Sequence, residues 1–144
     1  LIDVEEPAAV GALLAANGRV WRDLGIDGHF VGWRTNGWYR PQFHGIGKIF
    51  LDTRWLSRFP SGNLGILVVW QGEYRSAVPF PRSDGAADLA PESLVLSALL
   101  EVRIVDAVLT FQLRNPRPSR YAQVPGFLMP GPVQYYGVRW AFWN

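Results

Sequence analysis

Apolar residues recur at every second position in several separate stretches of this chain, and this alternation constrains the fold more than any other feature. Successive side chains of a β-strand point to opposite faces, so such alternation predicts strands that are apolar on one face. In residues 133–143, for example, Val138 and Trp140 share one face, whereas Arg139 lies on the other. The sequence therefore predicts an all-β protein.

The same alternation predicts the remaining strands. It is clear in residues 93–104 and 107–115, present in residues 45–55 and 63–74, and weaker in residues 24–33. Residues 8–22 stay open between a strand and a short helix, because Pro7 is followed by an alanine-rich run. We therefore expect about six or seven antiparallel strands.

The connections between these stretches differ in length in a regular order. Short links are expected near residues 22–25, 59–63 and 104–107, and long ones at residues 35–43, 75–92 and 116–132. Transmembrane barrels place short turns on the periplasmic side and longer loops outside the cell. The pattern favours one unit over residues 1–144, an up-and-down transmembrane β-barrel segment.

Hydropathy excludes a membrane-spanning helix but not a membrane-spanning strand. The longest unbroken apolar runs, such as residues 66–70, are far shorter than the roughly 20 residues that a helix needs. A strand needs only about 9 to 11 residues of alternating character. Basic residues are scattered and the net charge is only +2, so we expect no nucleic-acid partner.

Residues that carry catalytic or metal chemistry are sparse. The chain has no cysteine, and His29 and His44 are its only histidines, so a histidine or thiolate metal site is not expected. Glu101 with Arg103 on the polar face of a predicted strand indicates a charge ladder rather than a pair of catalytic acids. No phosphate-binding glycine loop opens a helix. We expect no enzyme activity, no cofactor and no metal.

The last third of the chain resembles the end of a TonB-dependent outer-membrane receptor. A strand ending in Arg114-Asn115 leads to Tyr121, and residues 124–131, VPGFLMPG, are similar to the family's Pro-Gly-x-x-Met-Pro-Gly loop. The final stretch, residues 136–142, follows in the same order as in the family. Earlier, residues 39–43 resemble the loop that enters a descending strand of these receptors.

The resemblance implies a bacterial outer-membrane location and a role in uptake of a large ligand such as a siderophore. The family's plug domain and TonB box precede its barrel, and neither is found in residues 1–144. Gly137, Trp140 and Phe142 resemble the signal that the barrel-assembly machinery recognises in the last strand. The implied partners are outer-membrane lipid, this machinery, and the remaining barrel strands, which come from another chain, a missing N-terminal part or further copies.

The barrel hypothesis assigns roles to two groups of residues. Ligand contacts are expected on the long loops, where recognition residues concentrate, at Trp38, Tyr39, Arg40 and Tyr121. Lipid contacts are expected at the apolar positions Leu96, Leu100, Leu109, Phe111, Val138 and Trp140. The alternative is a soluble β-sandwich that binds carbohydrate through exposed tryptophan and tyrosine.

Overall fold

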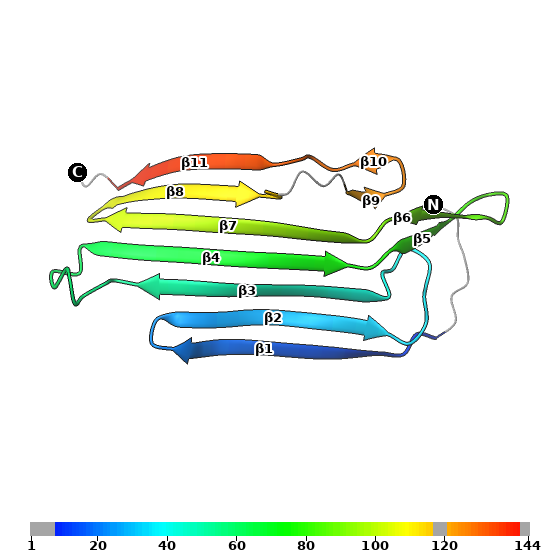
Figure 1. Cartoon of the computed structure of the whole chain (residues 1–144), viewed down its shortest axis with the longest axis horizontal. Helices are drawn as coiled ribbons and strands as arrows, with labels where there is room; N and C mark the ends of the chain where they lie inside the picture. Colours follow the sequence, from blue (N-terminus) through cyan, green and yellow to red (C-terminus); the bar gives the residue numbers. More distant parts are fainter. Residues whose placement is uncertain (1–7, 117–120, 142–144) are drawn as a thin grey trace.

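The computed structural model describes residues 8–116 and 121–141, and its main element is a single sheet of seven antiparallel strands (Figure 1). The order in the sheet is β1-β2-β3-β4-β7-β8-β11. The strands span Gly11–Trp21 (β1), Leu24–Trp33 (β2), Phe43–Thr53 (β3), Leu64–Arg75 (β4), Ser93–Ile104 (β7), Ala107–Arg114 (β8) and Val133–Trp140 (β11). The predicted all-β class is confirmed, and the sheet stays open rather than closing into a barrel.

The first strand settles the choice that the sequence left open. Residues 8–22 contain β1, which pairs with β2 from Gly11↔Trp33 to Trp21↔Leu24, with one irregularity after Arg19. Alanine-rich sequence has a high intrinsic helix propensity, but pairing with a neighbouring strand overrides such a weak preference. Of the two alternatives left open for residues 8–22, the strand is formed and the short helix is not.

Two small hairpins lie inside the long connections and were not predicted. Val78–Pro81 (β5) pairs with Ala87–Ala90 (β6) between β4 and β7. Ala122–Val124 (β9) pairs with Phe127–Leu128 (β10) between β8 and β11. Both hairpins lie at the same end of the sheet (Figure 1), so that end carries most of the structure outside the seven strands.

The connections segregate by end, but one expected turn was wrong. Residues 22–23 and 105–106 form tight turns at one end, whereas the β3–β4 link at that end covers residues 54–63 instead of only 59–63. The strand stops at Thr53 because its Oγ1 accepts a hydrogen bond from Trp55 N–H (3.0 Å), and Trp55 takes a φ of 46°. Arg58 and Phe59 N–H then donate to Trp55 O, forming a longer turn.

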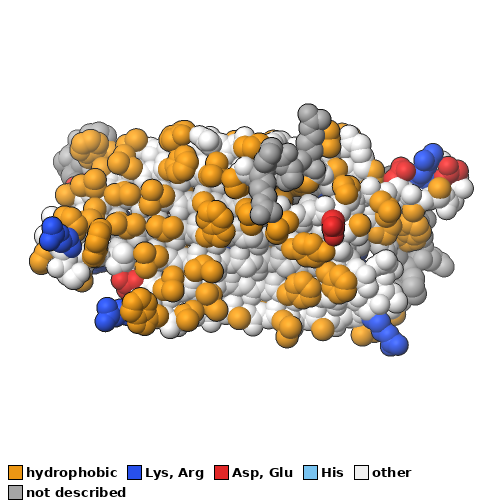
Figure 2. Space-filling model, in the orientation of Figure 1, with side chains coloured by type: hydrophobic (Ala, Val, Ile, Leu, Met, Phe, Trp, Pro, Cys, Tyr) orange, Lys and Arg blue, Asp and Glu red, His pale blue; other side chains and the backbone are white. Residues whose placement is uncertain are grey.

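The strand register divides the sheet into two faces of opposite character. Directly paired residues share a face, so the pairing follows rows such as Leu24, Leu51, Val68, Leu100, Phe111 and Tyr136 across the sheet. We call this the apolar face, and it carries no charged strand residue. Figure 2 shows hydrophobic side chains spread across the sheet.

The opposite face, here called the polar face, carries every charged residue of the seven strands. These residues are Arg19, Asp27, Lys48, Asp52, Glu73, Arg75, Glu101, Arg103, Arg114 and Arg139. Only a few apolar side chains in the described part of the chain are buried, and several of them lie at the hairpin end, including Val78, Ala90, Tyr121 and Ala122. The sheet itself therefore has no second layer over either face in the part that the structure describes.

Candidate functional site

The residues expected to contact lipid all lie on the apolar face. Leu96 pairs with Gly72, Leu100 with Phe111, and Leu109 with Val138, whereas Trp140 pairs with Ala107. Leu109 is 45% exposed and Trp140 61% exposed. Their common facing is thus confirmed by the strand register, and contact with lipid stays a prediction.

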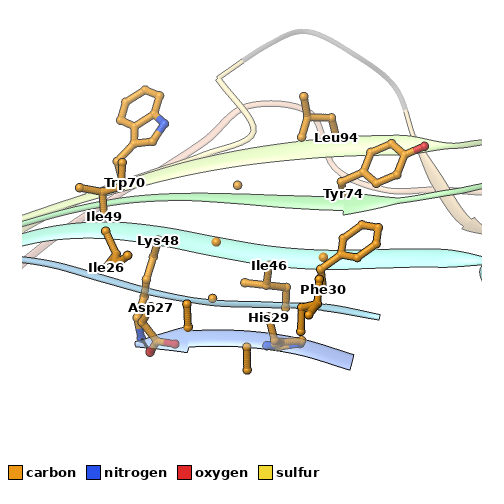
Figure 3. Close-up of a pocket in the computed structure, with 17 residues that line it drawn as sticks. Ile26, Asp27, His29, Phe30, Ile46, Lys48, Ile49, Trp70, Tyr74 and Leu94 are labelled. Atoms are coloured by element: carbon orange, nitrogen blue, oxygen red, sulfur yellow. Dashed lines mark ion pairs between the residues drawn. The ribbon is translucent and has the colours of Figure 1, made fainter. Parts of the chain in front are cut away.

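A wide groove crosses the apolar face from β1 to the first residues of β7, with a volume of about 840 Å³. Its floor consists of small residues directly paired with one another, Ala16, Gly28, Gly47 and Gly72. Its walls are Ile26, Ile49 and Trp70 on one side and Phe30, Tyr74 and Leu94 on the other (Figure 3). The groove is mainly apolar, as small-molecule pockets usually are, but it is open rather than enclosed.

The polar face carries cross-strand pairs of titratable side chains. Lys48 Nζ lies 2.8 Å from Asp27 Oδ2, and His44 Nε2 lies 3.3 Å from Glu73 Oε1. The rings of His29 and His44 meet edge to face at 6.2 Å. These pairs involve other residues than Glu101 and Arg103, for which the charge ladder was predicted, so that ladder stays a prediction. They lie on an open sheet face, whereas a nucleophile and its base are held together in a pocket.

The loop residues expected to contact ligand are held by the β5–β6 hairpin and by β2. Tyr39 N–H donates to Pro79 O (2.9 Å), and the Tyr39 ring packs against Phe80 at 5.4 Å. The Arg40 guanidinium lies 4.5 Å from the centroid of the Trp33 ring, in cation–π geometry. Trp38 and Tyr39 are partly exposed, so a molecule approaching the hairpin end reaches them.

Tyr121 differs from the other three predicted contact residues. It is only 7% exposed, and its backbone carbonyl accepts a hydrogen bond from Met129 N–H (2.8 Å). Tyr121 directly precedes β9 and is buried, whereas Tyr39 in the β2–β3 connection is exposed. Such burial favours a packing role for its ring over direct contact with a ligand.

Two residues that were not assigned a functional role from the sequence fix the segment of residues 121–130 to the sheet. Arg75 donates from Nη2 to Ala122 O (2.7 Å) and from Nη1 to Gln123 O (3.3 Å). Asn115 is 2% exposed, with its N–H on Leu96 O (2.7 Å) and its Nδ2 on Pro130 O (3.4 Å). Asn115 has a φ of 51°, a left-handed conformation that asparagine adopts more readily than most residues. An asparagine at the end of the predicted strand of residues 107–115 was the available sequence signal.

The residues of the predicted assembly signal lie in and beyond β11. Gly137 pairs with Thr110 on the polar face, and Trp140 pairs with Ala107 on the apolar face. Phe142 lies outside the described residues. β8 is the one strand of the sheet that pairs with β11 within the described ranges.

A metal site and a membrane-spanning helix were also looked for among the residues that the structure describes. Among them, no three histidine or acidic side chains gather closely enough to bind a metal ion. Likewise, no helix in residues 8–116 and 121–141 has the length and apolar character needed to cross a membrane.

Comparison with known proteins does not identify a family for this chain. No protein-family model matches the chain, and neither curated proteins nor solved structures give a significant match. The resemblance to TonB-dependent receptors therefore depends on the sequence motifs given above.

Proposed function

We propose that this chain is a wall segment of a bacterial outer-membrane β-barrel, similar to the C-terminal strands of a TonB-dependent receptor. It would take part in uptake of a large ligand such as a siderophore and have no catalytic role. One observation carries this proposal. Every charged residue of the seven strands lies on the polar face, whereas the broad apolar face is exposed.

The exposure of that face argues for an apolar environment. Large side chains such as Trp70, Tyr136 and Val138 are more than half exposed. Each Å² of apolar surface left in water costs about 25 cal/mol, and patches beyond several hundred Å² are rare on soluble monomers. Lipid would cover this surface, and the polar face would then line a wet lumen.

Strand length and connection order support the same proposal. Strands of 8 to 12 residues match the roughly 9 to 11 residues that cross a bilayer when tilted. In the proposed barrel, the hairpin end faces the outside of the cell, because long loops are extracellular in such barrels. Trp38, Tyr39 and Arg40 would then face incoming ligand.

The alternative, a soluble carbohydrate-binding sandwich, is favoured less. A sandwich buries the apolar face of one sheet against a second sheet about 10 Å away. The described residues form one large sheet and two hairpins at its end, so they supply no such layer. Most of the exposed tryptophan and tyrosine side chains of the strands lie on the apolar face, namely Trp21, Trp70, Tyr74, Tyr136 and Trp140.

Flotation tests the proposal. The full chain, refolded from urea into vesicles of phosphatidylethanolamine and phosphatidylglycerol, is expected to float with them and to resist carbonate extraction. Without vesicles or detergent it should aggregate, because the apolar face is then in water. A monodisperse chain in buffer that does not float would contradict the proposal and support the sandwich.

A further inference from the structure

The end of the sheet opposite the hairpins holds a charged pocket that is separate from the apolar groove. It lies where β1 and β3 end and β2 begins, and it has a volume of about 700 Å³. Pockets for small molecules usually have about 300–1,000 Å³. Basic and acidic side chains lie beside one another at this end of the sheet in Figure 2. We call the hollow the turn pocket, and its charged lining consists of Arg19, Arg22, Asp23, Asp52 and Arg54.

The two connections that form the turn pocket are fixed by hydrogen bonds. Asp52 N–H donates to Asp23 O (3.0 Å), which joins the β1–β2 turn to the end of β3. Trp55 N–H donates to Thr53 Oγ1 (3.0 Å), which holds the start of the β3–β4 connection. The two aspartates therefore belong to directly joined segments, and Arg54 follows closely after the second of them.

The charged groups of the turn pocket do not neutralise one another in pairs. Ion pairs among the described residues join other side chains, such as Lys48 with Asp27, and none joins an arginine of the turn pocket to one of its aspartates. Guanidinium groups bind phosphate oxygens through planar, bidentate hydrogen bonds. Carboxylates accept hydrogen bonds from an ammonium group. The pocket thus combines donors for a phosphate with acceptors for an ammonium group.

Arg22 connects the turn pocket with the apolar face. It lines the pocket, and its guanidinium lies 5.2 Å from the centroid of the Trp21 ring, in cation–π geometry. Trp21 pairs with Leu24, so its ring is on the apolar face, where it is 66% exposed. Trp55 and Leu56, which also line the pocket, are half exposed or more. Tryptophan is enriched at the head-group level of membranes, so these surroundings favour a ligand at the boundary between lipid and water.

We propose that the turn pocket binds the phosphoethanolamine head group of a membrane lipid. The arginines bind the phosphate, the aspartates bind the ammonium group, and the acyl chains pass over Trp21 onto the apolar face. This inference rests on the proposed function, because the acyl chains require that face to be in lipid. Phosphatidylglycerol has no ammonium group and would leave the aspartates without a partner. The ammonium of phosphatidylcholine is fully methylated and donates no N–H hydrogen bond, so the pocket should prefer phosphatidylethanolamine to both.

Calorimetric titration tests the head-group preference. The full chain in neutral detergent micelles is titrated with the dihexanoyl forms of phosphatidylethanolamine, phosphatidylcholine and phosphatidylglycerol. Phosphatidylethanolamine should bind about tenfold more tightly than phosphatidylglycerol, the factor that one hydrogen bond to a charged group supplies. Glycerophosphoethanolamine, the head group without acyl chains, should bind much more weakly than the lipid. Equal binding of the three lipids, no binding of phosphatidylethanolamine, or equally tight binding of glycerophosphoethanolamine as a free phosphoester would overturn the inference.

Variants of the turn pocket test the two halves of the site separately. Arg54→Gln should weaken binding of all three lipids about tenfold, because it removes a phosphate donor. Asp52→Asn should weaken binding of phosphatidylethanolamine but not of phosphatidylglycerol. Arg58→Gln is the matched control, since Arg58 is in the same connection and does not line the pocket.

The outcomes separate this inference from the proposed function. An effect of Arg54→Gln no larger than that of Arg58→Gln, or weaker binding of phosphatidylglycerol by Asp52→Asn, would overturn the inference. Flotation of the same variants with vesicles measures the membrane location independently. A chain that floats but shows no lipid preference contradicts this inference alone, whereas a chain that does not float contradicts the proposed function.

Discussion

Lys48 and Asp27 are direct backbone partners across β2 and β3, and their side chains form an ion pair of 2.8 Å on the polar face. Both side chains are partly exposed, so the pair is screened by solvent and salt. A double-mutant cycle with Lys48→Gln and Asp27→Asn should give a coupling of about 0.2–1 kcal/mol in low salt. Urea unfolding in detergent micelles measures it. A repulsive coupling would contradict the register of β2 and β3.

Gly28 and Gly47 are also direct partners, and only one of them needs to be glycine. A Cβ on Gly28 would lie 2.7 Å from Ile46 O, whereas a Cβ on Gly47 meets nothing within 4 Å. Gly47→Ala should therefore stabilise the chain by about 0.4–1 kcal/mol, because it restricts the unfolded state without strain. Gly28→Ala is the matched control and should destabilise. Equal effects in urea unfolding would show that the two backbones do not approach as described.

Arg75 is expected to hold the β9–β10 segment against the sheet. Hydrogen bonds that involve a charged group contribute about 1.5–3 kcal/mol, and Arg75 makes two of them to this segment. Arg75→Gln should speed amide exchange at residues 122–129 while exchange in β2 and β3 changes little. Arg103→Gln, on the same face, is the control. Unchanged exchange at residues 122–129 would remove the anchoring role.

Substitutions at the hairpin end should have two different effects, on ligand binding for Trp38, Tyr39 and Arg40 and on stability for Tyr121. Alanine at Trp38, Tyr39 and Arg40 together should weaken binding of ferric siderophores, the probe class, by the complete assembly. Tyr121→Ala should instead lower stability by about 3 kcal/mol, because a buried aromatic ring leaves a cavity. Isothermal titration and urea unfolding measure the two effects. Unchanged binding in the triple variant would remove the ligand-contact assignment.

The large strands were predictable because alternation is their physical cause. β2 and β7 begin and end where the pattern predicts, since each strand places one apolar face and one polar face across the same sheet. β1 was ambiguous because alanine and glycine give weak alternation, and its pairing with β2 decides its structure. The short hairpins were not predicted because their strands have only two to four residues. Such strands are too short to show an alternation of apolar and polar residues.

The candidate site was predictable in part. The alternation of apolar and polar residues determines which side chains share a face of the sheet. Leu109 and Val138 were therefore correctly predicted to share one face. The burial of Tyr121 and the contacts of Arg75 depend on how a long connection folds back on the sheet. No local pattern encodes such a contact between residues nearly fifty positions apart.

Two neighbouring substitutions in β8 test the central claim most directly. Leu109 is on the apolar face, and Thr110, paired with Glu101 and Gly137, is on the polar face. In phosphatidylethanolamine and phosphatidylglycerol vesicles, Leu109→Arg should cost about 2–4 kcal/mol in unfolding free energy if that face meets lipid. Thr110→Arg should cost much less, because its charge stays in water near Glu101. Equal costs for the two variants would contradict the account.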